Sequence, residues 1–181
     1  SEVEELLKRL EDILRENERR ARELNRKNKE VLKDNRRRAE EVNRRNKRML
    51  DEAERLAEDN VDKRELLERV KKVARETREL VKDLLRHSEK VVRDTRKVVE
   101  DILRHSEEVA ERVRREVKKI SDEKLVREVE TKIEEVRRRS EELVKEVEKS
   151  LKESEDDSRR LVREIEESIR ESEERIKRRV E

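Results

Sequence analysis

The sequence lacks cysteine, glycine, proline and every aromatic residue. Without cysteine, the chain can form no disulfide and no thiolate metal site, and it has no cysteine nucleophile. Without glycine and proline, the residues that usually make strand turns and break helices are missing. No apolar run approaches the roughly 18 residues that span a bilayer, and no signal peptide is visible. We therefore expect a soluble chain without a targeting signal, whose location the sequence leaves unknown.

Charged residues make up 59% of the 181 residues, and hydrophobic residues only 29%. Such a composition is typical of disordered chains, because few apolar groups are available to form a core. Here, however, 54 basic residues nearly balance 52 acidic residues, and the apolar residues recur with a helical period. A chain rich in Ala, Glu, Lys, Leu and Arg with this period is typical of long helices. The sequence therefore predicts a single all-α domain over residues 1–181.

Near-copies of an 18-residue unit occur in pairs along the chain. The pairs occupy residues 15–32 and 33–50, 77–94 and 95–112, and 140–157 and 158–175. A stretch of this length makes about five turns of an α-helix, so equivalent residues of two copies return to the same face. Because no strict seven-residue repeat forces a supercoil, the period predicts nearly straight helices.

Capping patterns divide the chain into three helices. Ser1 and Glu4 form an S-x-x-E capping box, Asp62 can cap a second helix, and Ser121 can cap a third. The expected helices cover about 2–59, 62–119 and 122–180. Because the connections are only a few residues long, sequential helices must fold back antiparallel. The predicted fold is all-α: an elongated, nearly straight, antiparallel three-helix bundle of up-down-up topology.

Polar side chains recur along the faces that the helices should turn inward. A buried amide, imidazole or hydroxyl costs a few kcal/mol unless its donors and acceptors are matched. Asn supplies both kinds of group, neutral His one of each, and Ser or Thr a rotatable hydroxyl, so these residues can form networks across three helices. The predicted buried network contains Asn17, Asn25, Asn28, Asn35, Asn43, Asn46, Thr77, His87, Thr95, His105, Ser140, Ser150, Ser154, Ser158 and Ser168.

The expected register places some of these residues at the same height. If the first connection centres near residue 61, Asn17 lies level with His105, and Asn35 lies level with His87. Such layers are expected to penalise wrong registers and wrong oligomers rather than to add stability. An all-apolar module is expected to precede the two modules that carry networks. It would contain Leu6, Leu10, Ile13, Val113, Val117, Val129 and Ile133.

Taken together, these features resemble de novo designed helical bundles with modular buried hydrogen-bond networks. The resemblance rests on the short capped connections, the surfaces filled with Glu, Lys and Arg, and the near-copies, which together cover the whole chain. It implies a structural scaffold or assembly module with no catalytic, cofactor-binding or metal-binding residues. A single chain of three helices departs from the helical-hairpin oligomers common in that class.

Enzymatic and metal-binding functions are not expected. His87 and His105 lie roughly 27 Å apart along one helix, which is too far to share an ion. The pairs His87–Ser88 and His105–Ser106 cannot act in hydrolysis, because neighbouring residues of a helix do not face each other. We therefore predict no enzyme and no cofactor.

Two alternative functions remain open at the level of sequence. If His87 and His105 are buried, their imidazoles resist protonation, and the bundle could respond to pH or form homo-oligomers through them. Non-specific nucleic-acid binding is suggested by 14 basic against 5 acidic residues from Arg19 to Arg48. No groove-reading motif or stacking aromatic accompanies that basic stretch.

Partners are not required by the sequence. Self-association is possible, with a helix-exchanged dimer or trimer as the competitor to the expected monomer. Binding to a membrane surface is not expected, since the apolar stripes are narrow and are needed for the core.

Overall fold

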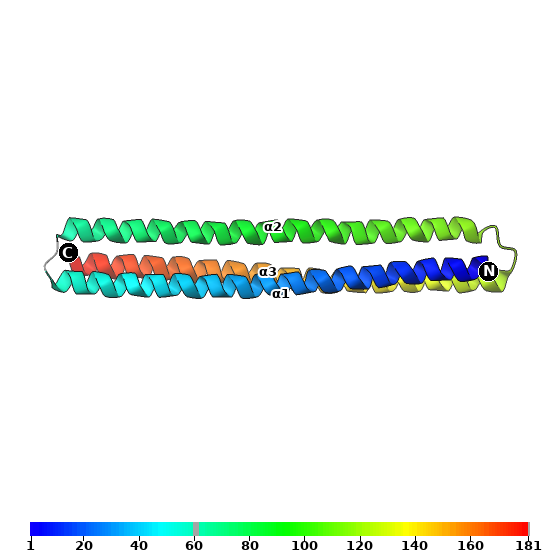
Figure 1. Ribbon diagram of the computed structural model, residues 1–181, viewed down its shortest axis with the longest axis horizontal. Helices are drawn as coiled ribbons and strands as arrows, with labels where there is room; N and C mark the ends of the chain where they lie inside the picture. The colour runs from blue at the N-terminus through cyan, green and yellow to red at the C-terminus, as the bar shows by residue number, and fades with distance from the viewer. Residues whose placement is uncertain (60–61, 181) are drawn as a thin grey trace. The chain divides into compact units, whose positions relative to one another are not determined.

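A computed structural model describes residues 1–59 and 62–180, which form three α-helices and no strand. Helix α1 spans Glu2–Glu58, α2 spans Lys63–Val117 and α3 spans Glu123–Val180 (Figure 1). The predicted helices are confirmed to within two residues at each end, which is the usual scatter of helix boundaries. The sequence also favours Asn60 as the residue that ends α1 and Val61 as a hydrophobic-staple residue, but both lie outside the described residues.

The first two helices begin at the predicted capping residues. The Glu4 N–H donates to Ser1 Oγ at 3.2 Å, and the Glu4 carboxylate lies 3.5 Å from the Ser1 nitrogen, so the capping box is confirmed. At the start of α2, the Arg64 N–H donates to the Asp62 carboxylate at 3.0 Å. Each cap satisfies a backbone donor that has no partner within its own helix.

The connection between α2 and α3 differs from the sequence prediction. The Ile120 N–H donates to the carbonyl of Val117, three residues earlier, at 3.0 Å, instead of to the carbonyl four residues earlier as in an α-helix. Helix α2 therefore ends two residues before the predicted position. The assignment of Ser121 as the third cap is wrong, because the Asp122 carboxylate accepts the Lys124 N–H at 3.0 Å. A charged carboxylate also interacts more favourably than a hydroxyl with the positive end of the helix dipole.

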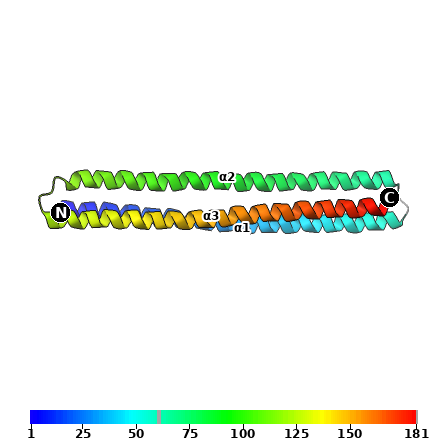
Figure 2. The same ribbon diagram turned by 180° about the vertical axis from the view of Figure 1, so that it is seen from behind.

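The described chain divides into two compact units. Unit 1 comprises Ser1–Lys29 and Val92–Glu153, and unit 2 comprises Glu30–Val91 and Ser154–Glu181. Each unit takes a stretch from all three helices, and these stretches lie side by side (Figures 1 and 2). The expectation of a single domain over residues 1–181 stays a prediction.

Pairs of residues establish the helix directions in unit 1. Arg9 pairs with Glu116, whereas Asn17, about two turns further along α1, bonds to Ser106, which lies earlier on α2. Helices α1 and α2 therefore run antiparallel. Pairs between α1 and α3 instead ascend together: Asn17 with Ser140, and Asn28 with Ser150. The up-down-up topology is confirmed in this unit.

Unit 2 has the same topology. Asn35 bonds to Ser88, whereas Glu52, further along α1, pairs with Arg69, which lies earlier on α2. Pairs between α1 and α3 again ascend together: Asn35 with Ser158, and Glu54 with Arg179.

Apolar clusters fill the interior of both units. The largest cluster of unit 1 includes all seven residues of the predicted apolar module. Another cluster of unit 1 contains Ala21, Leu24, Val99, Ile102, Val144 and Val147. Their equivalents at a spacing of 18 residues form a cluster of unit 2, with Ala39, Val42, Val81, Leu84, Val162 and Ile165. Because the two clusters match position by position, the repeat governs the apolar core as well as the polar positions. Burial of each large apolar side chain contributes about 1.5–3 kcal/mol to stability.

Within residues 1–59 and 62–180, no helix has an apolar stretch long enough to cross a bilayer.

Candidate functional site: the buried polar layers

The Asn17 layer joins all three helices of unit 1. Asn17 is buried and donates from Nδ2 to Ser106 Oγ on α2 at 2.6 Å and to Ser140 Oγ on α3 at 2.9 Å. Ser106 in turn donates its hydroxyl hydrogen to the carbonyl of Ile102 on its own helix, at 2.6 Å. Both amide hydrogens of Asn17 and the Ser106 hydroxyl therefore have partners, which offsets the cost of removing them from water.

The Asn35 layer repeats this arrangement in unit 2. Asn35 Nδ2 donates to Ser88 Oγ on α2 at 2.9 Å and to Ser158 Oγ on α3 at 2.8 Å. The two serines are also joined to each other, with an Oγ–Oγ distance of 3.4 Å. Each layer thus takes one side chain from each helix, at positions related by the 18-residue period.

The Asn28 layer, formed by Asn25, Asn28 and Ser150, is a second polar layer in unit 1. Asn28 is buried and donates from Nδ2 to Ser150 Oγ at 3.0 Å. The Ser150 hydroxyl can donate to Asn25 Oδ1 at 2.8 Å or to the Val147 carbonyl at 3.0 Å. Asn25 and Ser150 are half-buried, so this layer reaches the edge of the core.

The Asn46 layer, at the equivalent positions Asn43, Asn46 and Ser168 of unit 2, is different. Asn46 is buried, but neither its Nδ2 nor its Oδ1 has a hydrogen-bond partner among the described residues. Asn43 is exposed and Ser168 is half-buried. The sequence repeat therefore predicts the positions of this layer but not its hydrogen bonds.

The remaining predicted hydroxyl residues lie in the core. Thr77, Thr95 and Ser154 are buried. Thr77 donates to the carbonyl of Val73, one turn earlier on its own helix, at 2.8 Å. Such a bond within the helix satisfies the hydroxyl without linking two helices.

The predicted burial of His87 and His105 is wrong. Both imidazoles are exposed, and the next residue of each R-H-S-E segment, Ser88 or Ser106, supplies the α2 member of the layer. Successive residues of a helix are about 100° apart around its axis, so a one-residue difference exchanges an inward position for an outward one. The predicted register is thus correct to within one residue, but the residue of α2 that joins each layer is the serine and not the preceding histidine.

The pattern of α2 contains the signal that distinguishes the two neighbours. Steps of four, three, four, four and three residues lead from Thr77 to Thr95 through residues that are all buried or half-buried: Val81, Leu84, Ser88 and Val92. Ser88 lies on this path, four residues after Leu84, whereas His87 does not. Sequence reasoning also missed Ser172, which is buried and corresponds to Ser154 in the preceding copy.

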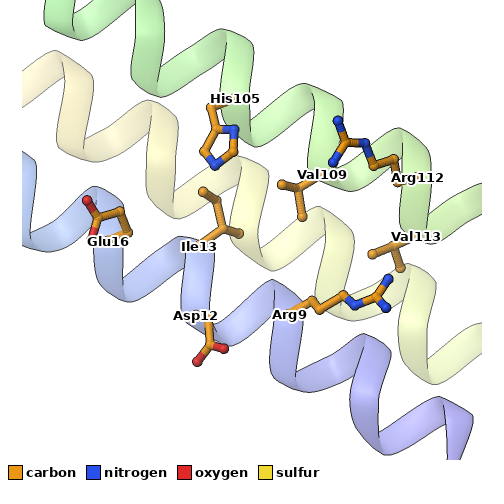
Figure 3. Close-up of a pocket in the computed structure, with 8 residues that line it drawn as sticks. All are labelled: Arg9, Asp12, Ile13, Glu16, His105, Val109, Arg112 and Val113. Atoms are coloured by element: carbon orange, nitrogen blue, oxygen red, sulfur yellow. The ribbon is translucent and has the colours of Figure 1, made fainter.

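The exposed His105 borders a surface groove of about 370 Å³ between α1 and α2 of unit 1. Its side chain extends from α2 toward α1, where Ile13 and Glu16 line the same groove (Figure 3). A hydrogen bond from Arg19 lowers the pKa of Glu16, and the nearby charges of Arg19, Arg20 and His105 act in the same direction.

Unit 2 contains the equivalent arrangement around His87. A hydrogen bond from Arg37 lowers the pKa of Asp34, and the charges of Arg38 and His87 lower it further. Each imidazole therefore lies near a carboxylate of α1 at the surface, instead of inside an uncharged core.

One ion pair between α1 and α3 is partly shielded from water. The Lys132 ammonium lies 2.6 Å from the Glu11 carboxylate, and the exposed fractions of the two side chains are 22% and 37%. Their hydrogen bond lowers the pKa of Glu11 and raises the pKa of Lys132. This pair stabilises the packing of α3 on α1 in unit 1.

Metal-ligating side chains do not cluster in the part of the chain that the structure describes. No group of three or more His, Cys, Asp or Glu residues there is arranged to hold a metal ion. The hydrogen-bonded asparagine and serine side chains are thus the most distinctive polar feature of the described interior.

Comparison with known proteins bears on the fold. No protein-family model and no curated protein sequence matches the chain. A solved structure described as a computationally designed three helix bundle is similar, with a TM-score of 0.62 and 18% sequence identity over 99% of this chain and 89% of that chain. The fold is a three-helix bundle. At this level of identity the likeness concerns the fold alone. The buried polar layers described above are a feature of this chain and are not part of that likeness.

Proposed function

We propose that the chain is a designed structural scaffold or assembly module whose helix register is set by the Asn17 and Asn35 layers. The observation that supports this proposal is the three-helix hydrogen bonding of each asparagine, repeated at 18 residues. The resemblance of the sequence to designed bundles, and the printed description of the similar structure as computationally designed, support the designed origin.

A polar layer acts mainly against incorrect packing. If α2 slid along α1 by one turn, Asn17 would face apolar residues of α2, and the amide hydrogen that it donates to Ser106 would lose its acceptor. Each unpaired buried group costs about 1–3 kcal/mol, whereas a correct hydrogen bond contributes only about 1 kcal/mol. The layers therefore discriminate between registers more strongly than they stabilise the correct one.

The test replaces both layers with apolar side chains. The variant carries Asn17→Leu, Asn35→Leu, and alanine at Ser88, Ser106, Ser140 and Ser158. We expect a helical, stable chain that has lost its single packing arrangement, seen as several species in light scattering or as multiple amide signals per residue in NMR spectra.

A matched control alters exposed polar residues of the same repeats. Asn43→Ala, His87→Ala and His105→Ala change side chains that lie at the surface, so one species should remain. If the apolar-layer variant stays a single species with the parent's contacts between helices, the layers do not set the register and the proposal fails.

A monomer is the state that we propose for this scaffold. Light scattering on a size-exclusion column measures the mass directly, and a mass near the 22.2 kDa of one chain is expected. A stable mass of two or three chains would indicate helix exchange or a further interface.

Nucleic-acid binding remains the less favoured candidate. Many cations of the basic stretch of α1 already pair with acidic residues of the same helix: Arg19 with Glu16, Lys27 with Glu23, Arg37 with Asp34, and Arg45 with Glu41. We expect only salt-sensitive, sequence-independent association with duplex DNA at low ionic strength.

A further inference from the structure

The amide of Asn46 is the least satisfied among the four asparagines that are buried in residues 1–59 and 62–180. Its exposed fraction is 2%, and both its Nδ2 and its Oδ1 lack partners among the described residues. Asn28 and Asn35 each leave only Oδ1 unpaired, since their amide nitrogens donate to serines. Asn46 therefore keeps the full cost of removing an amide from water without any compensating bond.

Two of the three neighbours nearest to Asn46 are already hydrogen-bonded elsewhere or exposed, and the third, Ser168, is half-buried. By the register of unit 2, Thr77 and Ser168 lie level with it, and Asn43 is one turn earlier on the same helix. The Thr77 hydroxyl donates within α2 to the Val73 carbonyl. Asn43 is exposed, whereas its equivalent Asn25 accepts a hydrogen bond in unit 1.

Apolar residues border this layer along α1 on both sides. Ala39 and Val42 belong to one apolar cluster of unit 2, and Met49 and Ala53 belong to another, with Asn46 between them. Asn46 is therefore flanked by apolar side chains on both sides along its helix.

We infer that unit 2 opens locally at the Asn46 layer, and that this opening lets water reach the buried amide. The opened state satisfies the Asn46 donors and acceptor with water, whereas the closed state leaves them unpaired. The equivalent Asn28 layer of unit 1 gains much less from opening, because its Asn28–Ser150 bond is lost. Two layers of nearly the same sequence thus differ in their tendency to open.

Hydrogen exchange on the full chain tests this inference. Backbone amides of residues 44–50 and 75–80 are compared with the equivalent amides of residues 26–32 and 93–98. We expect the first set to exchange faster, by at least about tenfold, which corresponds to the cost of an unpaired amide. The substitution Asn46→Leu should slow exchange of the first set by a similar factor.

The repeat supplies the matched control. Asn28→Leu removes an amide that is already hydrogen-bonded, so it should not slow exchange of residues 26–32, and it should lower the melting temperature relative to Asn46→Leu. Circular dichroism checks that both variants remain helical, and Asn46→Ala, which removes the amide without adding bulk, provides a second variant. If both Asn46 substitutions leave exchange at residues 44–50 unchanged, the unpaired amide is not the cause of opening and the inference is overturned.

Discussion

Asn17 and Asn35, 18 residues apart in the sequence, make the same pair of hydrogen bonds: each donates to one serine of α2 and one serine of α3. The amide is suited to this position because a single Nδ2 carries two hydrogens that point in different directions. A residue with only one donor could donate to one neighbouring helix but not to both. The asparagine at each layer therefore acts as the common partner of the other two helices.

Removal of this common partner should destabilise the protein. We expect Asn17→Ala to lower the free energy of unfolding by about 1–3 kcal/mol, because it takes the donors away from two buried serine hydroxyls. Urea denaturation followed by circular dichroism measures the change. Asn43→Ala is the control, since Asn43 is exposed and its loss should change stability by less than about 0.5 kcal/mol. Equal losses in the two variants would contradict the role assigned to Asn17.

Acidification should not destabilise the protein through its histidines. Both imidazoles are exposed at the surface, so neither His87 nor His105 forms part of the core packing. Between pH 7.5 and about pH 5.5, which brackets the ordinary pKa of histidine, the parent and the His87→Asn, His105→Asn double variant should show the same change in melting temperature. A markedly larger loss in the parent would mean that the imidazoles are buried after all.

The Glu11–Lys132 pair should contribute to stability over a defined range of pH. The hydrogen bond from Lys132 lowers the pKa of Glu11 below its ordinary 4.5 and raises that of Lys132 above its ordinary 10.5. The contribution is therefore fully present above pH 4.5 and is lost as the pH falls through the lowered pKa of Glu11. On the alkaline side, it is fully present below pH 10.5 and is lost as the pH rises through the raised pKa of Lys132.

A double-mutant cycle with Glu11→Gln and Lys132→Met measures this coupling. The cycle is needed because Lys132 also lies 3.5 Å from Glu135, and a single substitution would disturb both pairs. We expect about 0.5–1 kcal/mol at neutral pH, since both side chains are partly exposed and are screened by solvent. The same coupling energy at about pH 2.5, where carboxylates are largely protonated, would refute the assignment.

The start of α3 offers a comparison of two adjacent residues. Asp122→Ala removes the carboxylate that accepts the Lys124 N–H, and should cost about 1 kcal/mol in the free energy of unfolding. Ser121→Ala changes the exposed residue before it and should cost much less. Thermal or urea unfolding distinguishes them, and a larger loss from Ser121→Ala would restore the serine as the cap.

The helices and their order could be predicted from sequence because they depend on local and periodic signals. Apolar residues recur with the period of a helix, Asp62 lies where α2 begins, and short connections force neighbouring helices to run antiparallel. Ser140 and Ser158, which α3 contributes to the Asn17 and Asn35 layers, were predicted for the same reason. All of these inferences tolerate an error of one or two residues.

The side chains of α2 that complete the layers could not be predicted at that tolerance. His87 and Ser88 differ by only 1.5 Å in height but by about 100° in direction, so matching heights does not distinguish them. The unpaired amide of Asn46 could not be predicted at all, because its sequence surroundings match those of Asn28, which is hydrogen-bonded. The difference lies at the serine of α3: Ser150 accepts a hydrogen bond from Asn28, whereas its equivalent Ser168 makes no such bond with Asn46, and this depends on packing.

The two R-H-S-E segments place an exposed imidazole directly before a hydroxyl that belongs to a buried layer. Of two neighbours in the sequence, the histidine is thus accessible to reagents in solution, and the serine is held by a hydrogen bond to α1. Reagents, metal-affinity resins or engineered surface groups can reach His87 and His105, while the adjacent Ser106 is buried and the adjacent Ser88 is half-buried. The exposed residues of α2 can accordingly be substituted one at a time without removing Ser88 and Ser106, the hydroxyl groups to which Asn35 and Asn17 bind.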